Sequence, residues 1–154
     1  YPEALADDPA WAERAKQLAE RCFELTSFLV DVMDYRPAGR TFPATATYHD
    51  SCSGLRELGV FAQPRQLLSA VDGLDMVPLE GNDVCCGFGG TFCVFEEAVS
   101  VKMGKDRITE HSANEVEYIT GGDVSCLMHL EGILKRNRSN VKTIHIAEIL
   151  NSNA

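Results

Sequence analysis

Apolar residues in the first 40 positions recur at alternating steps of four and three, which is the spacing of one helix face. Asp8 and Pro9 are suited to the start of such a helix, because Asp accepts N-terminal N–H bonds and Pro fits the first turn. The stripe consists of Trp11, Ala15, Leu18, Cys22, Leu25, Leu29 and Val32. We therefore expect one long helix within residues 1–40, with Cys22 buried on a face that needs a partner surface.

After residue 40 the pattern changes to short β-forming runs that alternate with helical ones. The predicted strands are residues 44–48, 74–79, 116–120 and 141–145. The predicted helices are residues 55–58, 64–71, 94–112 and 126–135, with a short helix after the last strand. This alternation favours right-handed crossovers and a parallel sheet. The expected fold is an α/β domain over residues 41–154, with about four parallel strands flanked by helices.

Cysteines occupy the turns that follow three of the predicted strands. Cys52 follows the first strand, Cys85 and Cys86 follow the second, and Cys126 follows the third. Each turn leads from a strand into a helix, and in open parallel sheets such turns lie at the carboxyl edge, where ligands bind. The four thiols are therefore expected to converge on one site.

The turn with two adjacent cysteines is also rich in glycine. Its sequence, DVCCGFGGTFC over residues 83–93, places Gly87, Gly89 and Gly90 directly after the two thiols. Glycine lets backbone N–H groups approach a bound group closely and tolerates positive φ angles. Packing alone does not account for adjacent thiols in such a turn, so we interpret it as a ligand loop.

Composition narrows the functional classes. With 154 residues, 45% of them hydrophobic, the chain is long enough for one domain with its own core. The net charge of −9 argues against a nucleic-acid partner. The sequence has neither an apolar run of the ~18 residues that a transmembrane segment needs nor a signal pattern, so a cytoplasmic protein is expected. Because the first residue is Tyr1, we expect a portion of a longer polypeptide.

Six cysteines are too few for a disulfide scaffold, and clustered thiols in a reducing compartment bind metal or carry out redox chemistry. Three interpretations follow. Four thiolates from three loops match the ligands of an iron–sulfur cluster, which we favour. Zinc also accepts four sulfurs, or three sulfurs with His129, although adjacent cysteines are awkward for one tetrahedral ion. The third interpretation is metal-free chemistry, in which Cys85 and Cys86 cycle through a disulfide.

Two residues near the cysteine turns have several interpretations. His129 lies one helical turn after Cys126 and is interpreted first as a hydrogen-bond donor to a sulfur, with metal ligand and surface histidine as the alternatives. Cys93 begins the helix after the glycine loop and is interpreted as a packed thiol within reach of that loop.

Other polar residues give weaker signals. Asp50 is expected to cap the turn before Cys52, and His49 is a candidate for handling protons beside the site. His145 ends the fourth predicted strand, from which it could face the same crevice. His111 lies in a charged helical stretch and is predicted to face solvent.

The cysteine spacing resembles the cysteine-rich "CCG" domain that is found in a heterodisulfide reductase subunit and in the iron–sulfur subunit of glycolate oxidase. A narrower likeness, to the lactate-utilisation protein A family, runs through most of the chain. The motifs that carry it are YHDSCSGLRELG at 48–59, CCGFGGTF at 85–92, GD at 122–123 with SCLM at 125–128, and HIAEIL at 145–150.

The resemblance implies a cytosolic subunit of a complex that oxidises L-lactate to pyruvate together with companion iron–sulfur subunits. Members of the family resemble two such domains in tandem, so this chain looks like the C-terminal half, preceded by its own N-terminal CCG domain. Residues 1–40 then look like the helical connector between the two domains. By position, Cys52, Cys85, Cys86 and Cys126 are the implied ligands of a [4Fe–4S] cluster. His129 stands where heterodisulfide reductase has a further cysteine, which makes a four-thiolate cluster the simpler expectation.

The motifs do not locate a substrate site. A substrate carboxylate would need an arginine or exposed N–H groups, and Arg56, Arg65 and Arg107 are candidates by residue type.

Overall fold

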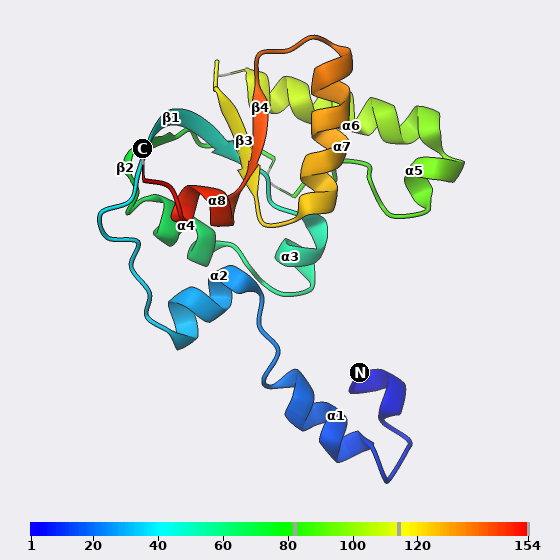
Figure 1. Ribbon diagram of the computed structural model, residues 1–154. Coiled ribbons are helices and arrows are strands. Elements are labelled where there is room, and N and C mark those ends of the chain that lie inside the picture. The colour runs from blue at the N-terminus through cyan, green and yellow to red at the C-terminus, as the bar shows by residue number, and fades with distance from the viewer. Residues whose placement is uncertain (82, 114, 154) are drawn as a thin grey trace.

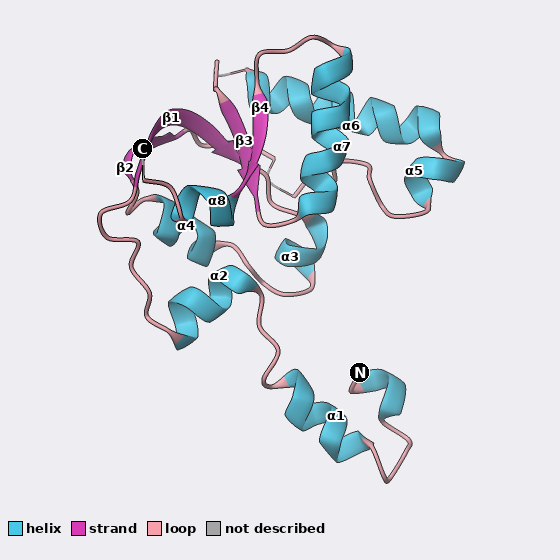
Figure 2. Ribbon diagram, viewed as in Figure 1, coloured by secondary structure: helices cyan, strands magenta, loops and turns pink. Residues whose placement is uncertain are grey.

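The computed structural model describes residues 1–81, 83–113 and 115–153. These residues form one four-stranded sheet. Helices lie on both sides of this sheet (Figure 1 and Figure 2). The strands are β1 (Thr41–Tyr48), β2 (Asp72–Met76), β3 (Tyr118–Gly121) and β4 (Lys142–His145). The α-helices are α1 (Ala12–Ala19), α2 (Leu25–Ser27), α3 (Cys52–Arg56), α4 (Ala62–Leu68), α5 (Phe92–Phe95), α6 (Glu97–Ser112), α7 (Val124–Arg136) and α8 (Ile146–Leu150). A 3₁₀ turn, η1 (Glu3–Leu5), and a π-helical turn, η2 (Phe28–Val32), complete these elements.

All strand pairs in the sheet are parallel, and the strand order is β2-β1-β3-β4. Tyr48 at the end of β1 is paired with Thr120 of β3, and Gly121 is paired with His145 of β4. Three strands therefore end at one level of the carboxyl edge. The predicted α/β fold with a four-stranded parallel sheet is confirmed.

Hydrophobic cores cover both faces of the sheet. Successive side chains of a strand point to opposite faces, so Thr47 contacts His111 of α6 while Tyr48 packs with α4 and α8. The core under α6 and α7 contains Cys86, Ile108, Ile119, Cys126, Leu127, Leu130, Ile133 and Leu134. The core under α4 and α8 contains Tyr48, Leu67, Leu68, Val71, Ile146, Ile149 and Leu150. Two of the predicted ligand cysteines thus belong to the first core.

The prediction of one long N-terminal helix is wrong. Helix α1 ends at Ala19, and a new helix begins after Glu24, which has an extended backbone. The Glu24 carboxylate accepts hydrogen bonds from the backbone N–H groups of Thr26 and Ser27, at 2.7 and 3.1 Å. This cap satisfies the free N–H groups of a helix start, so it stabilises a break that apolar spacing does not reveal.

The break also changes which residues of the stripe are buried. Thr26 is fully buried, and η2 packs on α4, whereas α1 lies apart from the sheet (Figure 1). Cys22, predicted to be buried, is exposed because it lies in the break. Trp11 and Leu18 of α1 are each 48% exposed. Within the described residues, no helix is long and apolar enough to cross a membrane.

Helices α6 and α7 cross closely next to the double-cysteine loop, and Gly104 of α6 lies at the contact. A Cβ at this position would meet the Ile133 side chain, the His129 ring at 2.9 Å and the Cys86 carbonyl oxygen at 3.3 Å. The absence of a side chain therefore lets α6, α7 and the loop approach one another.

We expect Gly104→Ala to be about 1–3 kcal/mol less stable than Gly132→Ala, because an added methyl group overpacks the first position. Gly132 lies in α7 with nothing within 4 Å of an added Cβ, so the two variants share the gain in helix propensity and differ in the clash. Chemical denaturation of both variants measures this difference. Equal stabilities would contradict the close packing at Gly104.

Candidate metal centre

The described structure brings the four predicted cysteines to the carboxyl edge of the sheet. Cys52 is the first residue of α3, Cys126 lies in the first turn of α7, and the adjacent pair lies in the loop between β2 and α5. Both helix starts are capped. The Ser51 hydroxyl accepts from Gly54 N–H at 3.1 Å, and the Asp123 carboxylate accepts from Cys126 N–H at 3.3 Å.

The thiols meet in two pairs. The Sγ atoms of Cys86 and Cys126 and one ring nitrogen of His49 lie within 4.8 Å of one another, and all three residues are buried. The half-buried thiols of Cys85 and Cys52 interact through a hydrogen bond. The two pairs also interact electrostatically. Cys86 contributes to the raised pKa of Cys85, and Cys52 contributes to the raised pKa of Cys126. The two pairs of thiols therefore lie within electrostatic range of each other, with one pair shielded from water and the other accessible.

The glycine loop brings a backbone donor to this cluster. Gly87 has a φ of 91°, and its N–H donates to the Cys85 sulfur at 3.4 Å. A Cβ on Gly87 would lie 2.6 Å from the Ser100 carbonyl oxygen. The position therefore requires glycine both for its backbone angle and for the close approach of α6. Gly89 and Gly90 continue the turn, also at positive φ.

Three side chains from two helices hold the double-cysteine loop by its carbonyl groups. Arg56 of α3 donates to the Asp83 carbonyl at 2.6 Å. From α6, Arg107 donates to the Gly81 carbonyl at 2.9 Å, and the Ser100 hydroxyl donates to the Gly87 carbonyl at 2.7 Å. These bonds fix the loop before its two thiols, at Gly81 and Asp83, and after them, at Gly87.

The thiols have unequal proton affinities. A hydrogen bond from Cys126 lowers the pKa of Cys86, and His49 adds to this effect. The same contact with Cys86, together with burial, raises the pKa of Cys126. Burial is the main reason that the pKa of Cys85 is raised. The protein environment thus stabilises a thiolate at Cys86 first.

A network of buried polar side chains lies behind the thiols, and it was not predicted from the sequence. His111, predicted to face solvent, is fully buried, and its Nδ1 lies 2.8 Å from the Thr47 hydroxyl. Arg107 is also fully buried and contacts His49. The sequence carried a signal for this network: Arg107 and His111 are four apart, so they share a helix face, and Thr47 and His49 share a strand face. The charged neighbours of His111 on the opposite helix face led to the wrong prediction.

The remaining predicted residues have other contacts. His129 lies with its Nε2 3.4 Å from the Ser100 carbonyl and its ring against Phe88, so it reaches the glycine loop through Ser100. The Cys93 thiol donates to the Gly90 carbonyl at 3.0 Å. The functional role of His129 therefore stays a prediction.

His145 has a structural role at the start of α8. Its Nδ1 accepts from Ala147 N–H at 3.2 Å, and Glu148 completes a capping box. Its Nε2 lies 3.1 Å from the Gly122 carbonyl. These bonds tie α8 to the turn before α7.

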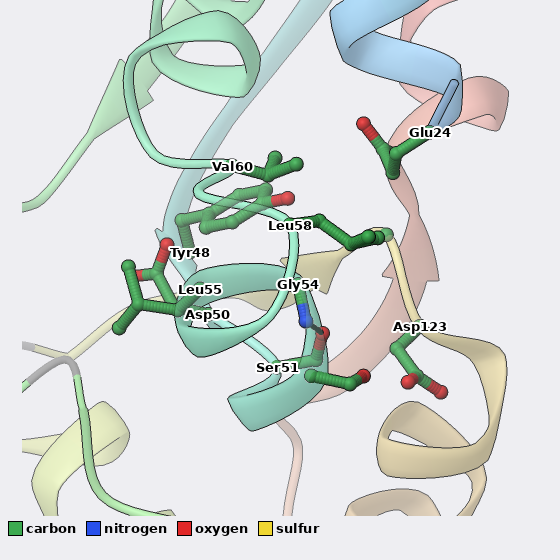
Figure 3. A pocket seen from close by; sticks show the side chains of 11 residues that line it. Glu24, Tyr48, Asp50, Ser51, Gly54, Leu55, Leu58, Val60 and Asp123 are labelled. Carbon is green, nitrogen blue, oxygen red and sulfur yellow. Dashed lines mark hydrogen bonds between the residues drawn. The ribbon is translucent and has the colours of Figure 1, made fainter. Parts of the chain in front are cut away.

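A small cavity of about 140 Å³ borders the Cys52 turn (Figure 3). The carboxylates of Glu24, Asp50 and Asp123 are among its lining groups, with Ser51 and Tyr48. Glu24 and Asp123 cap helices. Like charges repel, so this acidic lining disfavours a carboxylate ligand in the cavity.

Residues 46–131, more than half of the chain, match the family model described as a cysteine-rich domain, CCG. The chain belongs to this CCG family, which confirms the predicted membership. The match covers Cys52, the double-cysteine loop and Cys126.

Curated relatives extend the similarity over nearly the whole chain. It is 47% identical to the lactate utilization protein A of an Exiguobacterium species over 151 residues, which are 98% of this chain and 62% of the relative. It is 44% identical to the lactate utilization protein A of Bacillus subtilis and 43% identical to the uncharacterized protein YkgE of Escherichia coli. Each of these two matches covers 152 residues, 99% of this chain and 64% of the relative. The chain therefore spans less than two thirds of the length of these relatives.

In the reduced, metal-free protein we expect the thiolate of Cys86 to persist under acidic conditions in which an ordinary thiol is protonated. Its folded pKa is lowered, so the thiolate is complete at neutral pH and is lost only as the pH falls through that lowered value. A pH titration of thiolate ultraviolet absorbance measures this.

Cys86→Ser should remove the acid-range thiolate signal, and Cys22→Ser, at the exposed break after α1, should leave it unchanged. A wild-type protein whose thiolate absorbance is complete only in the alkaline range would contradict the assignment.

Proposed function

We propose that this chain is an iron–sulfur redox domain in which Cys52, Cys85, Cys86 and Cys126 hold a [4Fe–4S] cluster. The observation that supports the proposal is that three turns at one edge of the sheet carry four interacting thiols, two of which lie within 4.8 Å of each other. Four cysteine thiolates are the usual ligand set of such a cluster. Bound at this edge, a cluster would supply reversible one-electron chemistry.

The residues present fit this group in two respects. The donor set is sulfur-rich, and a thiolate is already favoured at Cys86 without metal. A ring nitrogen of His49 lies within 4.8 Å of the Cys86 and Cys126 sulfurs, and a hydrogen bond with His49 is among the causes that lower the pKa of Cys86. A polar group is therefore available beside the thiols to stabilise a bound, negatively charged centre.

The protein groups around the site have separable tasks. Burial of Cys86 and Cys126, which are 2% and 6% exposed, excludes water from one half of the site. The more exposed Cys52 and Cys85 leave the other half accessible to a redox partner. The Gly87 N–H donates to a sulfur, and such bonds stabilise negative charge and help to set a reduction potential.

We further propose that the domain serves a complex that oxidises L-lactate to pyruvate. The similarity to lactate utilization protein A of Exiguobacterium and Bacillus subtilis supports this substrate. All three candidate arginines for a substrate carboxylate already have partners. Arg65 is paired with Asp50, Arg107 with Glu110, and Arg56 with a carbonyl group. These pairings favour electron transfer over direct lactate binding as the task of this domain.

The proposed partners follow from the same likeness. They are companion iron–sulfur subunits and an N-terminal CCG domain of the same longer protein, which we propose packs on the exposed apolar residues of α1. Ligand thiols must stay reduced, so the proposal places the protein in a reducing compartment, the cytoplasm.

Two other functions have some support. A zinc-stabilised interaction domain is supported by the close group of His49, Cys86 and Cys126, whose ligand types suit zinc. A thiol or heterodisulfide reductase is supported by Cys85 and Cys52, which are free and partly accessible. Assays of the complex with lactate and with a disulfide substrate would separate the reductase from the electron-transfer domain.

Anaerobic analysis of iron and acid-labile sulfide is expected to give about four of each per chain, with an EPR signal in one oxidation state. Cys85→Ser and Cys126→Ser should lose most of the iron, because each removes a ligand from a different turn.

Cys22→Ser is the matched control and should keep the wild-type iron content. About one zinc per chain without sulfide would defeat the cluster proposal and favour the structural domain. Retention of iron in both ligand variants would contradict the assigned ligands.

A further inference from the structure

Four buried polar side chains form a connected network under the thiol cluster. Thr47, His49, Arg107 and His111 are each at most 2% exposed. They come from the end of β1 and from one face of α6. Such a group is costly to bury unless its hydrogen bonds are satisfied, so the direction of each bond is informative.

The contacts converge on one nitrogen atom. Arg107 Nε donates to His49 Nδ1 at 3.5 Å, and His111 Nε2 lies 3.4 Å from the same Nδ1. The other ring nitrogen of His111 is 2.8 Å from the Thr47 hydroxyl. His49 Nδ1 therefore faces two groups at once.

The chemistry of arginine sets the direction of these bonds. A guanidinium group is always protonated and has only donors, so Nδ1 of His49 must be the acceptor. The Thr47 hydroxyl can donate to His111 Nδ1, which leaves His111 Nε2 as a second donor to His49. A neutral His111 is required for this pattern, and burial together with His49 and Arg107 lowers the pKa of His111 to about 2.

A neutral histidine that accepts at Nδ1 carries its proton on Nε2. The ring of His49 lies beside the Cys86 and Cys126 sulfurs, and a hydrogen bond with His49 is among the causes that lower the pKa of Cys86. Because Nδ1 faces Arg107 and His111, Nε2 is the nitrogen left to make that bond. An N–H group there can donate to a thiolate but offers no lone pair to a metal. For His49 to bind a metal through Nε2, its proton would have to move to Nδ1 and point at the Arg107 and His111 donors.

We infer that His49 acts as an N–H donor to the sulfur of Cys86, not as a metal ligand, and that Arg107 and His111 are positioning residues that fix its tautomer. The part that concerns a bound metal rests on the proposed function. The part that concerns the tautomer stands on the protein alone. The proposed metal ligands are then the four cysteine thiolates without His49.

The tautomer is measurable in the reduced, metal-free protein by long-range proton–nitrogen NMR of the histidine rings, with His49 assigned through His49→Gln. We expect His49 to carry its proton on Nε2 only. A proton on Nδ1, or protons on both nitrogens, would overturn the inference. The tautomer is read on the wild-type protein, and His49→Gln serves only to assign the resonances.

The positioning role is tested with Arg107→Met, which removes the cationic donor to Nδ1. We expect a severalfold increase in the Nδ1-protonated fraction of His49. Arg136→Met, at the exposed end of α7, is the control and should leave the tautomer unchanged. An unchanged tautomer in folded Arg107→Met would remove Arg107 from the network. If that variant does not fold, the wild-type tautomer still decides the inference.

Variants of His49 in the metal-loaded protein test whether this residue is a hydrogen-bond donor or a metal ligand. His49→Gln keeps an N–H donor, and His49→Leu removes it. Both variants should keep the wild-type metal content, whereas a loss of most of the metal in both would identify His49 as a ligand. In His49→Leu the reduced form loses a hydrogen bond, so we expect a shift of about tenfold in the reduction equilibrium towards the oxidised form.

That shift corresponds to about 59 mV for a one-electron couple. His49→Gln should shift less than His49→Leu, and equal potentials in all three proteins would overturn the donor role. Wild-type protein that contains zinc without sulfide would defeat the proposed function, while the tautomer result would remain valid.

Discussion

The parallel pairing of β1 with β3 is the constraint on which the candidate site depends. It places the end of β1 beside the end of β3, where the backbone N–H of His49 donates to the backbone carbonyl of Thr120 at 2.7 Å. Gly121 allows this approach, because a Cβ there would lie 2.9 Å from the His49 carbonyl oxygen. The turns that carry Cys52 and Cys126 start from these two strand ends. The register of the sheet therefore brings both turns to one edge, where the thiols of Cys52 and Cys126 interact electrostatically.

Helix α6 supplies the support that the sheet edge lacks. Ser100 and Arg107 hold the double-cysteine loop by its carbonyl groups, and Gly104 lets the loop and α7 approach. Arg107 also contacts His49, so one buried cation serves both the loop and the strand end. His49 in turn helps to lower the pKa of Cys86, so the residues that hold the fold together at this edge also affect the chemistry of the site.

Local pattern was sufficient for the sheet and for the positions of the cysteine turns. Short runs of β-forming residues alternate with helical ones, and parallel connection follows from that alternation. The N-terminal stripe shows the limit of this reasoning. Its spacing was helical on both sides of the break, yet Glu24 capped a second helix and Thr26 became buried. Capping and packing on α4 outweighed a continuous helical pattern.

The sequence by itself determined the fold class and the edge of the sheet that carries the cysteines. These depend on local geometry and on topology rules that apply to any parallel sheet. Only the tertiary structure decided that His49, and not His129, lies beside the buried thiols, and that Arg107 and His111 are buried behind it. Those contacts join residues about 60 positions apart, and no local spacing encodes which face of α6 meets the end of β1.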